Sequence, residues 1–215
     1  MINNKDLAAI RKDYTLRTFN ESQVLTDPVE QFRLWLNEAI EADVNEPNAM
    51  TLATVYENGN PSARIVLLKG LSENGFVFYT NYNSNKGKQI QHNPNAALVF
   101  FWPELQRQVR IEGVINKGSK KDATAYFQSR PIESRIGAHA SRQSEVIKSR
   151  EELENSYNTL KTLFEKEPLL CPVDWGGFVL KPCSMEFWQG RASRLHDRIL
   201  FTLHDKKWLI ERLAP

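Results

Sequence analysis

The chain has 215 residues, of which 41% are apolar and 25% are charged, with a formal net charge of +2. This composition is typical of a globular protein with one sizeable domain, and the small net charge excludes nucleic-acid binding driven by bulk electrostatics. The polar start and the lack of long apolar runs predict a cytoplasmic protein without a membrane span. Cys171 and Cys183 form no Cys-x-x-Cys pair, and the histidines lack metal-ligand spacing, so we expect no disulfide framework and no metal.

The N-terminal part divides at Asp27. Residues 1–26 are polar and weakly periodic, which predicts an N-terminal arm rather than a packed element. Asp27-Pro28 then predicts the start of a helix, with Asp27 as cap and Glu30 completing a capping box. The apolar residues of this helix recur at helical spacing and predict one buried face: Phe32, Trp35, Leu36, Ala39 and Ile40.

Short β-branched or aromatic runs follow, separated by turn signals. They predict strands at residues 50–56, 63–69, 76–80, 96–102 and 107–115. Asn58-Gly59 predicts a tight hairpin between the first two strands, and Ser84–His92 predicts a short helix that ends before Pro94.

The remainder of the chain predicts helices and then more strands. Helices are expected at residues 120–129, ended by Pro131, and at 149–166, where Ser149 and Glu152 form a capping box. Strands return at 177–181, 185–189, 199–204 and 208–212. Hairpin-linked strands with inserted helices predict an α+β fold, an antiparallel barrel-like sheet, in one domain spanning residues 27–215. The alternation of a doubly wound parallel sheet is missing.

The sequence lacks a dinucleotide fingerprint, a phosphate loop and a nucleophile elbow, so its clusters of basic residues carry the functional argument. The first is Arg64-Ile-Val-Leu-Leu-Lys69. Its apolar centre predicts a strand buried on both faces, and a cation there needs an anion such as phosphate. The alternative is that both side chains lie at strand ends and reach water. Period-two geometry places Arg64 and Lys69 on opposite faces.

Two further clusters combine hydroxyl groups with cations. Phe78-Tyr-Thr-Asn81, followed by Ser84-Asn-Lys86, would suit a phosphate at a helix N-terminus, although an ordinary strand–loop–helix corner is the commoner explanation. Tyr126 and Arg130 are neighbours on one helical face, with Gln143 and Ser144 downstream. They could hold a phosphate and an aromatic ring or form a surface cation–π pair.

The fourth cluster is Phe187-Trp-Gln-Gly190 with Arg194-Leu-His-Asp-Arg198. In an extended segment Arg194, His196 and Arg198 point to one face, which would lower the pKa of the histidine and attract a phosphate. Neutralisation of an exposed edge strand by Asp197 is the alternative. Because packing alone does not require three such residues on one face, we favour an anion site.

These stretches together resemble the pyridoxamine 5′-phosphate oxidase family, nearly from end to end of the chain. Each matching stretch is short, but their common order and spacing make a chance match very improbable. They are Arg11-Lys-Asp-Tyr14, Arg64–Lys69, Phe78–Asn81, Arg107-Gln-Val109, Tyr126-Phe127, Ser129-Arg-Pro131, Gln143-Ser144, Trp175-Gly-Gly-Phe178, Phe187–Gly190, Arg194–Arg198 and Arg212-Leu-Ala-Pro215.

The resemblance implies an FMN-binding split barrel that forms a homodimer with FMN at the subunit interface. It implies oxidation of pyridoxamine or pyridoxine 5′-phosphate to pyridoxal 5′-phosphate, the last step of synthesis and salvage of that compound. The electron acceptor would be O₂, which gives H₂O₂, with ammonia released from the amine. Nucleic acid and membrane are not expected as partners.

The resemblance also implies site residues, by their positions in this sequence. FMN would be contacted by Arg64, Ile65, Val66, Leu67, Leu68, Lys69, Tyr79, Thr80, Asn85, Lys86, Gln108, Gln143, Ser144, Trp188 and Arg198. The substrate would be bound by Arg11, Tyr14, Lys69, Tyr126, Arg130, Ser134, Arg194, Leu195 and His196. Arg194 and His196 would be the catalytic residues, and Arg11 and Tyr14 would belong to a segment that closes over the substrate.

One position departs from the family pattern: Asn85 stands where an arginine is common, which puts one phosphate contact in doubt. Lys88 could substitute for that arginine. Two other functions stay open, a split-barrel flavin reductase that uses a nicotinamide cofactor and a non-enzymatic carrier of pyridoxal phosphate or FMN. The substrate set around Tyr126 and Arg194 argues against both.

Overall fold

The structure, a computed structural model, describes residues 13–72 and 74–215, so the expectation for Arg11 lies outside the described residues. Its elements, in chain order, are η1 (Glu21–Gln23), α2 (Pro28–Glu41), β1 (Ala49–Val55), β2 (Pro61–Leu67), β3 (Gly70–Ser72), β4 (Gly75–Asn81), α3 (Asn85–His92), β5 (Asn95–Trp102), β6 (Arg107–Lys117), α4 (Lys120–Ser129), α5 (Ile132–Ala140), α6 (Arg150–Phe164), β7 (Trp175–Gln189), η2 (Ala192–Arg194), β8 (Asp197–His204) and β9 (Lys207–Arg212). Among the described residues, no helix has the length and apolarity of a membrane span.

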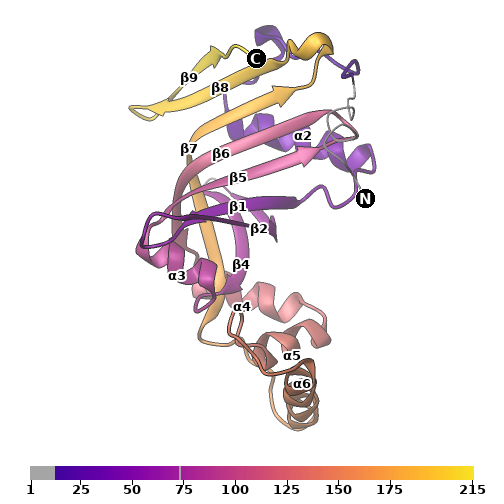
Figure 1. Ribbon diagram of the computed structural model, residues 1–215, viewed down its shortest axis with the longest axis vertical. Helices are drawn as coiled ribbons and strands as arrows, with labels where there is room; N and C mark the ends of the chain where they lie inside the picture. Colours follow the sequence, from indigo (N-terminus) through magenta and orange to yellow (C-terminus); the bar gives the residue numbers. More distant parts are fainter. Residues whose placement is uncertain (1–12, 73) are drawn as a thin grey trace, which may run out of the picture. The chain divides into compact units, whose positions relative to one another are not determined.

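One sheet contains all the strands (Figure 1). Its main path runs β2-β1-β5-β6-β7-β4-β3, and β8 pairs with β7 and β9. The pairs β1–β2, β3–β4, β4–β7, β7–β8 and β8–β9 are antiparallel, which confirms the predicted antiparallel α+β fold. The predicted tight turn is also present, since Gly59 has a φ of 84° between β1 and β2, a conformation that costs glycine little.

The chain forms two compact units, and β5, β6 and β7 contribute residues to both. Unit 1 comprises residues 1–47, 99–111 and 183–215, and unit 2 comprises 48–98 and 112–182. A single domain spanning 27–215 stays a prediction.

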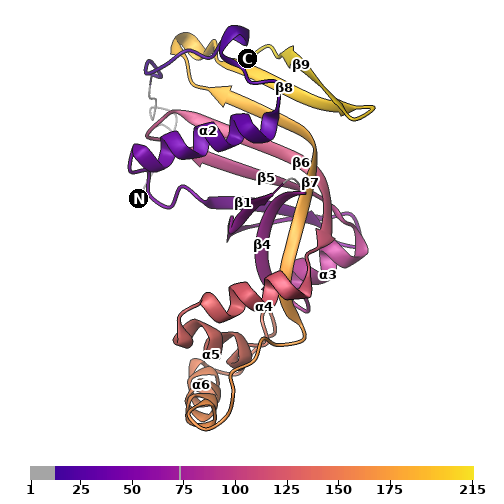
Figure 2. The same cartoon turned by 180° about the vertical axis from the view of Figure 1, so that it is seen from behind.

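The core of unit 1 forms between α2 and the sheet (Figure 2). Phe32 lies 4.8 Å from Phe100 of β5, and Trp35 lies 5.2 Å from Phe187 of β7, between ring centroids. Phe19, which we expected in an unpacked arm, is 4% exposed because its ring packs 4.8 Å from Trp35. An apolar residue in a polar segment can thus be a core residue.

The predicted start of α2 is correct, whereas two of its details are wrong. Asp27 accepts a hydrogen bond from the backbone N–H of Val29. Glu30 pairs with Arg33 one turn on instead of completing a capping box. Ile40 is 57% exposed, since the buried stripe of α2 ends at Ala39.

In unit 2, buried aromatic rings join β4 to β7, where Phe78 lies 5.7 Å from Phe178. The helices α5 and α6 lie side by side (Figure 1). The structure adds α5, which the sequence analysis missed because Pro131 was interpreted only as a stop. Pro131 is in fact the residue that precedes the first turn of α5.

Two strand predictions need correction. β7 is one strand where we expected two. Its first half pairs with β4 and its second half with β8. Pro182 lies where the partner strand changes, so its missing N–H costs little. β2 is not buried on both faces: Ile65 is 64% exposed and Leu67 is 36% exposed. Burial alternates along β2, so Ile65 and Leu67 lie on one exposed side-chain face while the residue between them faces the sheet's covered side.

Candidate functional site

The Arg64 guanidinium is the centre of a polar cluster in unit 2. It donates to the side-chain oxygens of Thr54, Ser62 (2.6 Å) and Gln89 (3.0 Å) and to the carbonyl of Leu52 (3.2 Å). Burial lowers the pKa of Arg64. Within the described ranges none of its hydrogen bonds or ion pairs involves a carboxylate, so its charge is solvated by neutral oxygens alone.

Lys86 adds a buried cation beside the half-buried Arg64, and it is 9% exposed. Its Nζ donates to Thr80 Oγ1 at 3.1 Å and to Ser84 Oγ at 3.4 Å. Burial, and next the charge of Arg64, lower its pKa to about 8. A buried ammonium beside a guanidinium is unfavourable unless an anion compensates both. Lys86 and Arg64 therefore form a site suited to a phosphate group.

The local fold holds Lys86 in this position. Ser84 caps α3 by accepting from the backbone N–H of Gly87 at 3.3 Å, and its hydroxyl donates to the carbonyl of Asn81 at 2.7 Å. A side chain at position 87 would begin 2.1 Å from the carbonyl oxygen of Tyr82, so only glycine permits this close approach. The strand-to-helix corner is thus tightly specified.

Gln143, far along the chain, is brought to the same place. Its Oε1 accepts from Thr80 Oγ1 at 2.9 Å and from the backbone N–H of Asn81 at 3.3 Å. Four of the predicted FMN residues therefore lie in one cluster: Arg64, Thr80, Lys86 and Gln143. Other predicted residues of unit 2 have exposed side chains: Lys69, Asn85, Ser134 and Ser144.

A stack of aromatic rings forms a second group in unit 2. Tyr79 lies 4.1 Å from Tyr126 with the rings 18° from parallel, and 5.5 Å from Trp175. The Arg130 guanidinium lies 5.1 Å from the Trp175 ring. Burial is the main cause that raises the pKa of both tyrosines and lowers that of Arg130. Arg130 Nη1 is buried without a hydrogen-bond partner among the described residues, which marks it as a donor for a ligand.

Two of the predicted residues of unit 1, Trp188 and Tyr14, pack around His196. Its ring lies 4.6 Å from Trp188 and 5.9 Å from Tyr14, between centroids. Tyr14 also packs against Gly190, where an added Cβ would lie 2.7 Å from its ring. Burial, then the charges of Arg194 and Arg198, lower the pKa of His196, in the direction that the sequence predicted.

The predicted alternation from Arg194 to Arg198 is wrong, since β8 begins only at Asp197. Arg194 ends the short turn η2, in which Ser193 and Arg194 have φ angles of 56° and 61°. Arg198 is paired, because its Nε donates to Glu186 at 2.8 Å, and this pairing raises its pKa. Leu195 is 69% exposed, and Gln108 is a half-buried residue of β6.

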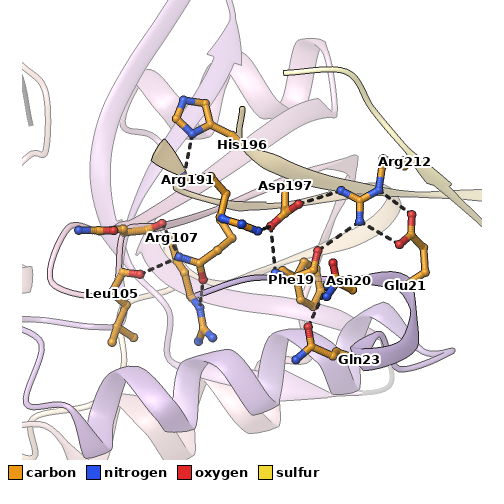
Figure 3. A network of polar contacts seen from close by, with 12 residues as sticks. Phe19, Asn20, Glu21, Gln23, Leu105, Arg107, Arg191, His196, Asp197 and Arg212 are labelled. Carbon is orange, nitrogen blue, oxygen red and sulfur yellow. Dashed lines mark hydrogen bonds and ion pairs between the residues drawn. The ribbon is translucent and has the colours of Figure 1, made fainter. Parts of the chain in front are cut away.

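The sequence analysis gave Asp197 only a neutralising role and gave Arg191 none, yet both are central to unit 1 (Figure 3). Asp197 is 7% exposed and accepts from Arg191 at 2.7 Å, from Arg212 at 2.9 Å and from the backbone N–H of Phe19 at 3.0 Å. Arg212 Nε in turn donates a hydrogen bond to Glu21 Oε1 at 2.6 Å. Their spacing along the chain gave no signal for these contacts, which are made between distant segments.

Comparison with known proteins identifies the family. The sequence profile described as "Pyridoxamine 5'-phosphate oxidase" matches residues 36–164, and that of the "Pyridoxine 5'-phosphate oxidase C-terminal dimerisation region" matches 175–215. A curated "Pyridoxine/pyridoxamine 5'-phosphate oxidase" of Gloeothece citriformis is 53% identical over 99% of this chain and 100% of its own length. That of Cytophaga hutchinsonii is 53% identical over 98% and 99%.

Solved structures agree on the fold. PhzG from Burkholderia lata, crystallised with tetrahydrophenazine-1-carboxylic acid, superposes with a TM-score of 0.88 at 27% identity, over 94% of this chain and 99% of its own. A pyridoxamine 5′-phosphate oxidase-related, FMN-binding protein from Nostoc punctiforme gives 0.69 at 22% identity, over 86% and 97%. The sheet is thus the split barrel of these proteins, and the chain belongs to the pyridoxine/pyridoxamine 5′-phosphate oxidase family.

Proposed function

We propose that this protein is an FMN-dependent oxidase that converts pyridoxamine or pyridoxine 5′-phosphate to pyridoxal 5′-phosphate with O₂ as electron acceptor. The products are the aldehyde and H₂O₂, with ammonia from the amine. The names and full-length similarity of the curated relatives support the substrate class. A cytoplasmic location stays a prediction.

The observation that carries the proposal is a pair of cations, half-buried Arg64 and buried Lys86, for which the described residues supply no carboxylate partner. Arg64 lies beside the hydroxyl group of Ser62, and Lys86 lies beside those of Thr80 and Ser84. Such a donor set suits a phosphate monoester such as that of FMN. The lowered pKa of both cations shows what an anion would relieve. The residues present therefore fit the phosphate end of FMN.

Arg130 supplies the second phosphate site. Its Nη1, which has no partner in the part of the chain that the structure describes, lies beside Trp175 and would bind the phosphate of the substrate together with Lys69, Tyr126 and Ser134. An enzyme that binds a phosphorylated cofactor and a phosphorylated substrate at the same time needs two separate phosphate sites.

Residues of unit 1 would complete the active site. The matched dimerisation region, 175–215, includes Trp188, Arg194, His196 and Arg198, which supports a homodimer. We propose that FMN lies at the interface between subunits, with Gln108, Trp188 and Arg198 also contacting it. Arg194 and His196 would contact the pyridine ring of the substrate.

When bound, FMN would supply the redox chemistry, which is hydride acceptance from the substrate and transfer of the electrons to O₂. The protein's own groups orient the reactants. Arg130 fixes the substrate by its phosphate, Arg194 contributes positive charge over the ring, and His196 holds or moves a proton of the substrate. Such orientation of a bound pair is a large source of rate acceleration.

The decisive experiment is anaerobic addition of pyridoxamine 5′-phosphate to the purified yellow protein, followed by admission of air. We expect the visible flavin absorbance to bleach and then return, with H₂O₂ formed. Bleaching by NADPH but not by the phosphorylated amine would instead identify a flavin reductase. A protein that binds these compounds without bleaching would be a carrier, and either result would refute the oxidase.

A further inference from the structure

We infer that Asp197 is a positioning residue: through Arg191, Asp197 holds His196 as the tautomer protonated on Nε2. Asp197 also binds the N-terminal segment, at Phe19, to the same loop. The inference rests on the proposed function only for what His196 does toward the substrate. How the histidine is held follows from contacts within unit 1.

The backbone geometry selects the tautomer. The N–H of Arg191 donates to His196 Nδ1 at 3.1 Å, so Nδ1 must present a lone pair and the ring proton lies on Nε2. A protonated imidazolium would bring an N–H against another N–H. His196 is therefore a neutral ring that offers a hydrogen-bond donor at Nε2.

The loop that makes this contact is under strain and needs an anchor. Between Arg191 and His196 the backbone passes through two consecutive left-handed residues, Ser193 and Arg194, neither of which is glycine. Such conformations persist only where surrounding contacts hold them. Within the loop itself, the N–H of Leu195 donates to the carbonyl of Ala192 at 3.1 Å.

Asp197 provides the anchor. Its Oδ2 accepts from Arg191 Nη1 at 2.7 Å, so the two ends of the loop are joined by a charged pair next to the histidine contact (Figure 3). The same oxygen accepts from the backbone of Phe19, and Oδ1 accepts from Arg212. Because Phe19 follows Tyr14, which lies against His196, one carboxylate fixes both the loop and the segment that packs on it.

The charged groups that act on His196 allow a sharp test. Burial, then the charges of Arg194 and Arg198, lower its pKa, whereas the charge of Asp197 raises it; its ring neighbours are Trp188 and Tyr14. If Asp197 acted by charge alone, Asp197→Asn would lower the pKa of His196 further. If Asp197 holds the Arg191 contact, losing that contact frees Nδ1 to take a proton, and the pKa rises toward its ordinary value.

The experiment is NMR of the histidine ring nitrogens in the flavin-loaded protein without substrate, titrated with pH, for wild type, Asp197→Asn and Arg191→Ala. We expect wild type to show one tautomer, protonated on Nε2. Both variants should show a mixture of tautomers and a higher pKa of His196. The matched control is Asp205→Asn, the same substitution in an exposed turn of unit 1 at the other end of β8, which should leave His196 unchanged.

Activity supplies a second readout. Each variant should lose about 10- to 100-fold in kcat/KM, and the double variant should lose no more than the worse single variant, because both act through one contact. Should Asp197→Asn fail to fold, Arg191→Ala carries the test, since the Arg191 side chain is 36% exposed. Retention of the single tautomer in Arg191→Ala, or a lower pKa of His196 in a folded Asp197→Asn protein, would overturn the inference. The NMR result is independent of turnover, so it stands apart from a failure of the oxidase proposal.

Discussion

Lys86→Met separates the two effects of a buried cation, because it should weaken FMN binding and yet stabilise the flavin-free protein. Lys86 is 9% exposed, so its Nζ would meet a phosphate with little intervening water. A hydrogen bond to a charged group contributes about 2–3 kcal/mol, which corresponds to about 30- to 150-fold in the Kd for FMN.

Without flavin, Lys86→Met should have the opposite effect and stabilise the folded protein. A pKa of about 8 in place of the ordinary 10.5 means that the folded protein disfavours the charged ammonium. The difference corresponds to about 3 kcal/mol, or about 1–2 kcal/mol after solvent screening is allowed for. Methionine removes this cost, and Thr80 and Ser84 keep their other hydrogen bonds, to Gln143 and to the carbonyl of Asn81.

The pH dependence follows from the same pKa. Below pH 8 both folded and unfolded chains hold the proton, so the cost of the buried charge is fully present. Between pH 8 and 10.5 only the unfolded chain holds it, so wild-type stability rises relative to Lys86→Met as the cost disappears.

The assays are thermal unfolding of flavin-free protein and titration with FMN. At pH 7 we expect the Tm of flavin-free Lys86→Met to rise by about 2–6 °C and its Kd for FMN to increase as given above. Lys121→Met, on the exposed surface of α4, is the control and should change neither quantity. A lower Tm in flavin-free Lys86→Met, or an unchanged Kd for FMN, would show that Lys86 is not an uncompensated phosphate ligand.

Three further substitutions test other parts of the site. Arg130→Ala should raise KM for pyridoxamine 5′-phosphate about 30- to 150-fold, because Arg130 Nη1 has no hydrogen-bond partner among the described residues. Steady-state oxidation of unphosphorylated pyridoxamine should change little, and equal losses for both amines would contradict the assignment. Arg194→Ala should bind FMN as wild type does but turn over slowly, and undiminished kcat would remove Arg194 from the catalytic residues. Asn85→Arg should tighten FMN binding about threefold to tenfold, because the side chain at position 85 is exposed beside Lys86. A fluorescence titration that shows no gain in affinity would mean that the residue at position 85 does not affect FMN binding.

Much of the secondary structure was predictable from local signals. Capping by Asp27 and Ser149, the Asn58-Gly59 turn and the apolar runs determine element type within a few residues, and the structure confirms them. The errors occur where tertiary context decides. Pro182 lies within β7 because the strand changes partner there. Ile65 is exposed because it lies on the outer of the two faces of β2, along which burial alternates.

The functional clusters show the same division. Residues close in sequence, such as Thr80 and Lys86, were predicted together because one strand-to-helix corner holds both. The Gln143 contact with Thr80 depends on the path of the chain between them, and only the resemblance to the family pointed to it. Asp197 was overlooked because its importance lies in contacts with Phe19 and Arg212, and Arg191 because its importance lies in its pairing with Asp197.

The sequence by itself determined which chemical groups are present: two sets of cations suited to phosphates, and a histidine between two arginines. Only the tertiary structure decided which of those charges are already neutralised. Arg198 is paired with Glu186, whereas Lys86 is buried against neutral oxygens. The physical reason is that a side chain's charge is set by its own chemistry, but its free energy depends on partners that distant segments bring into contact.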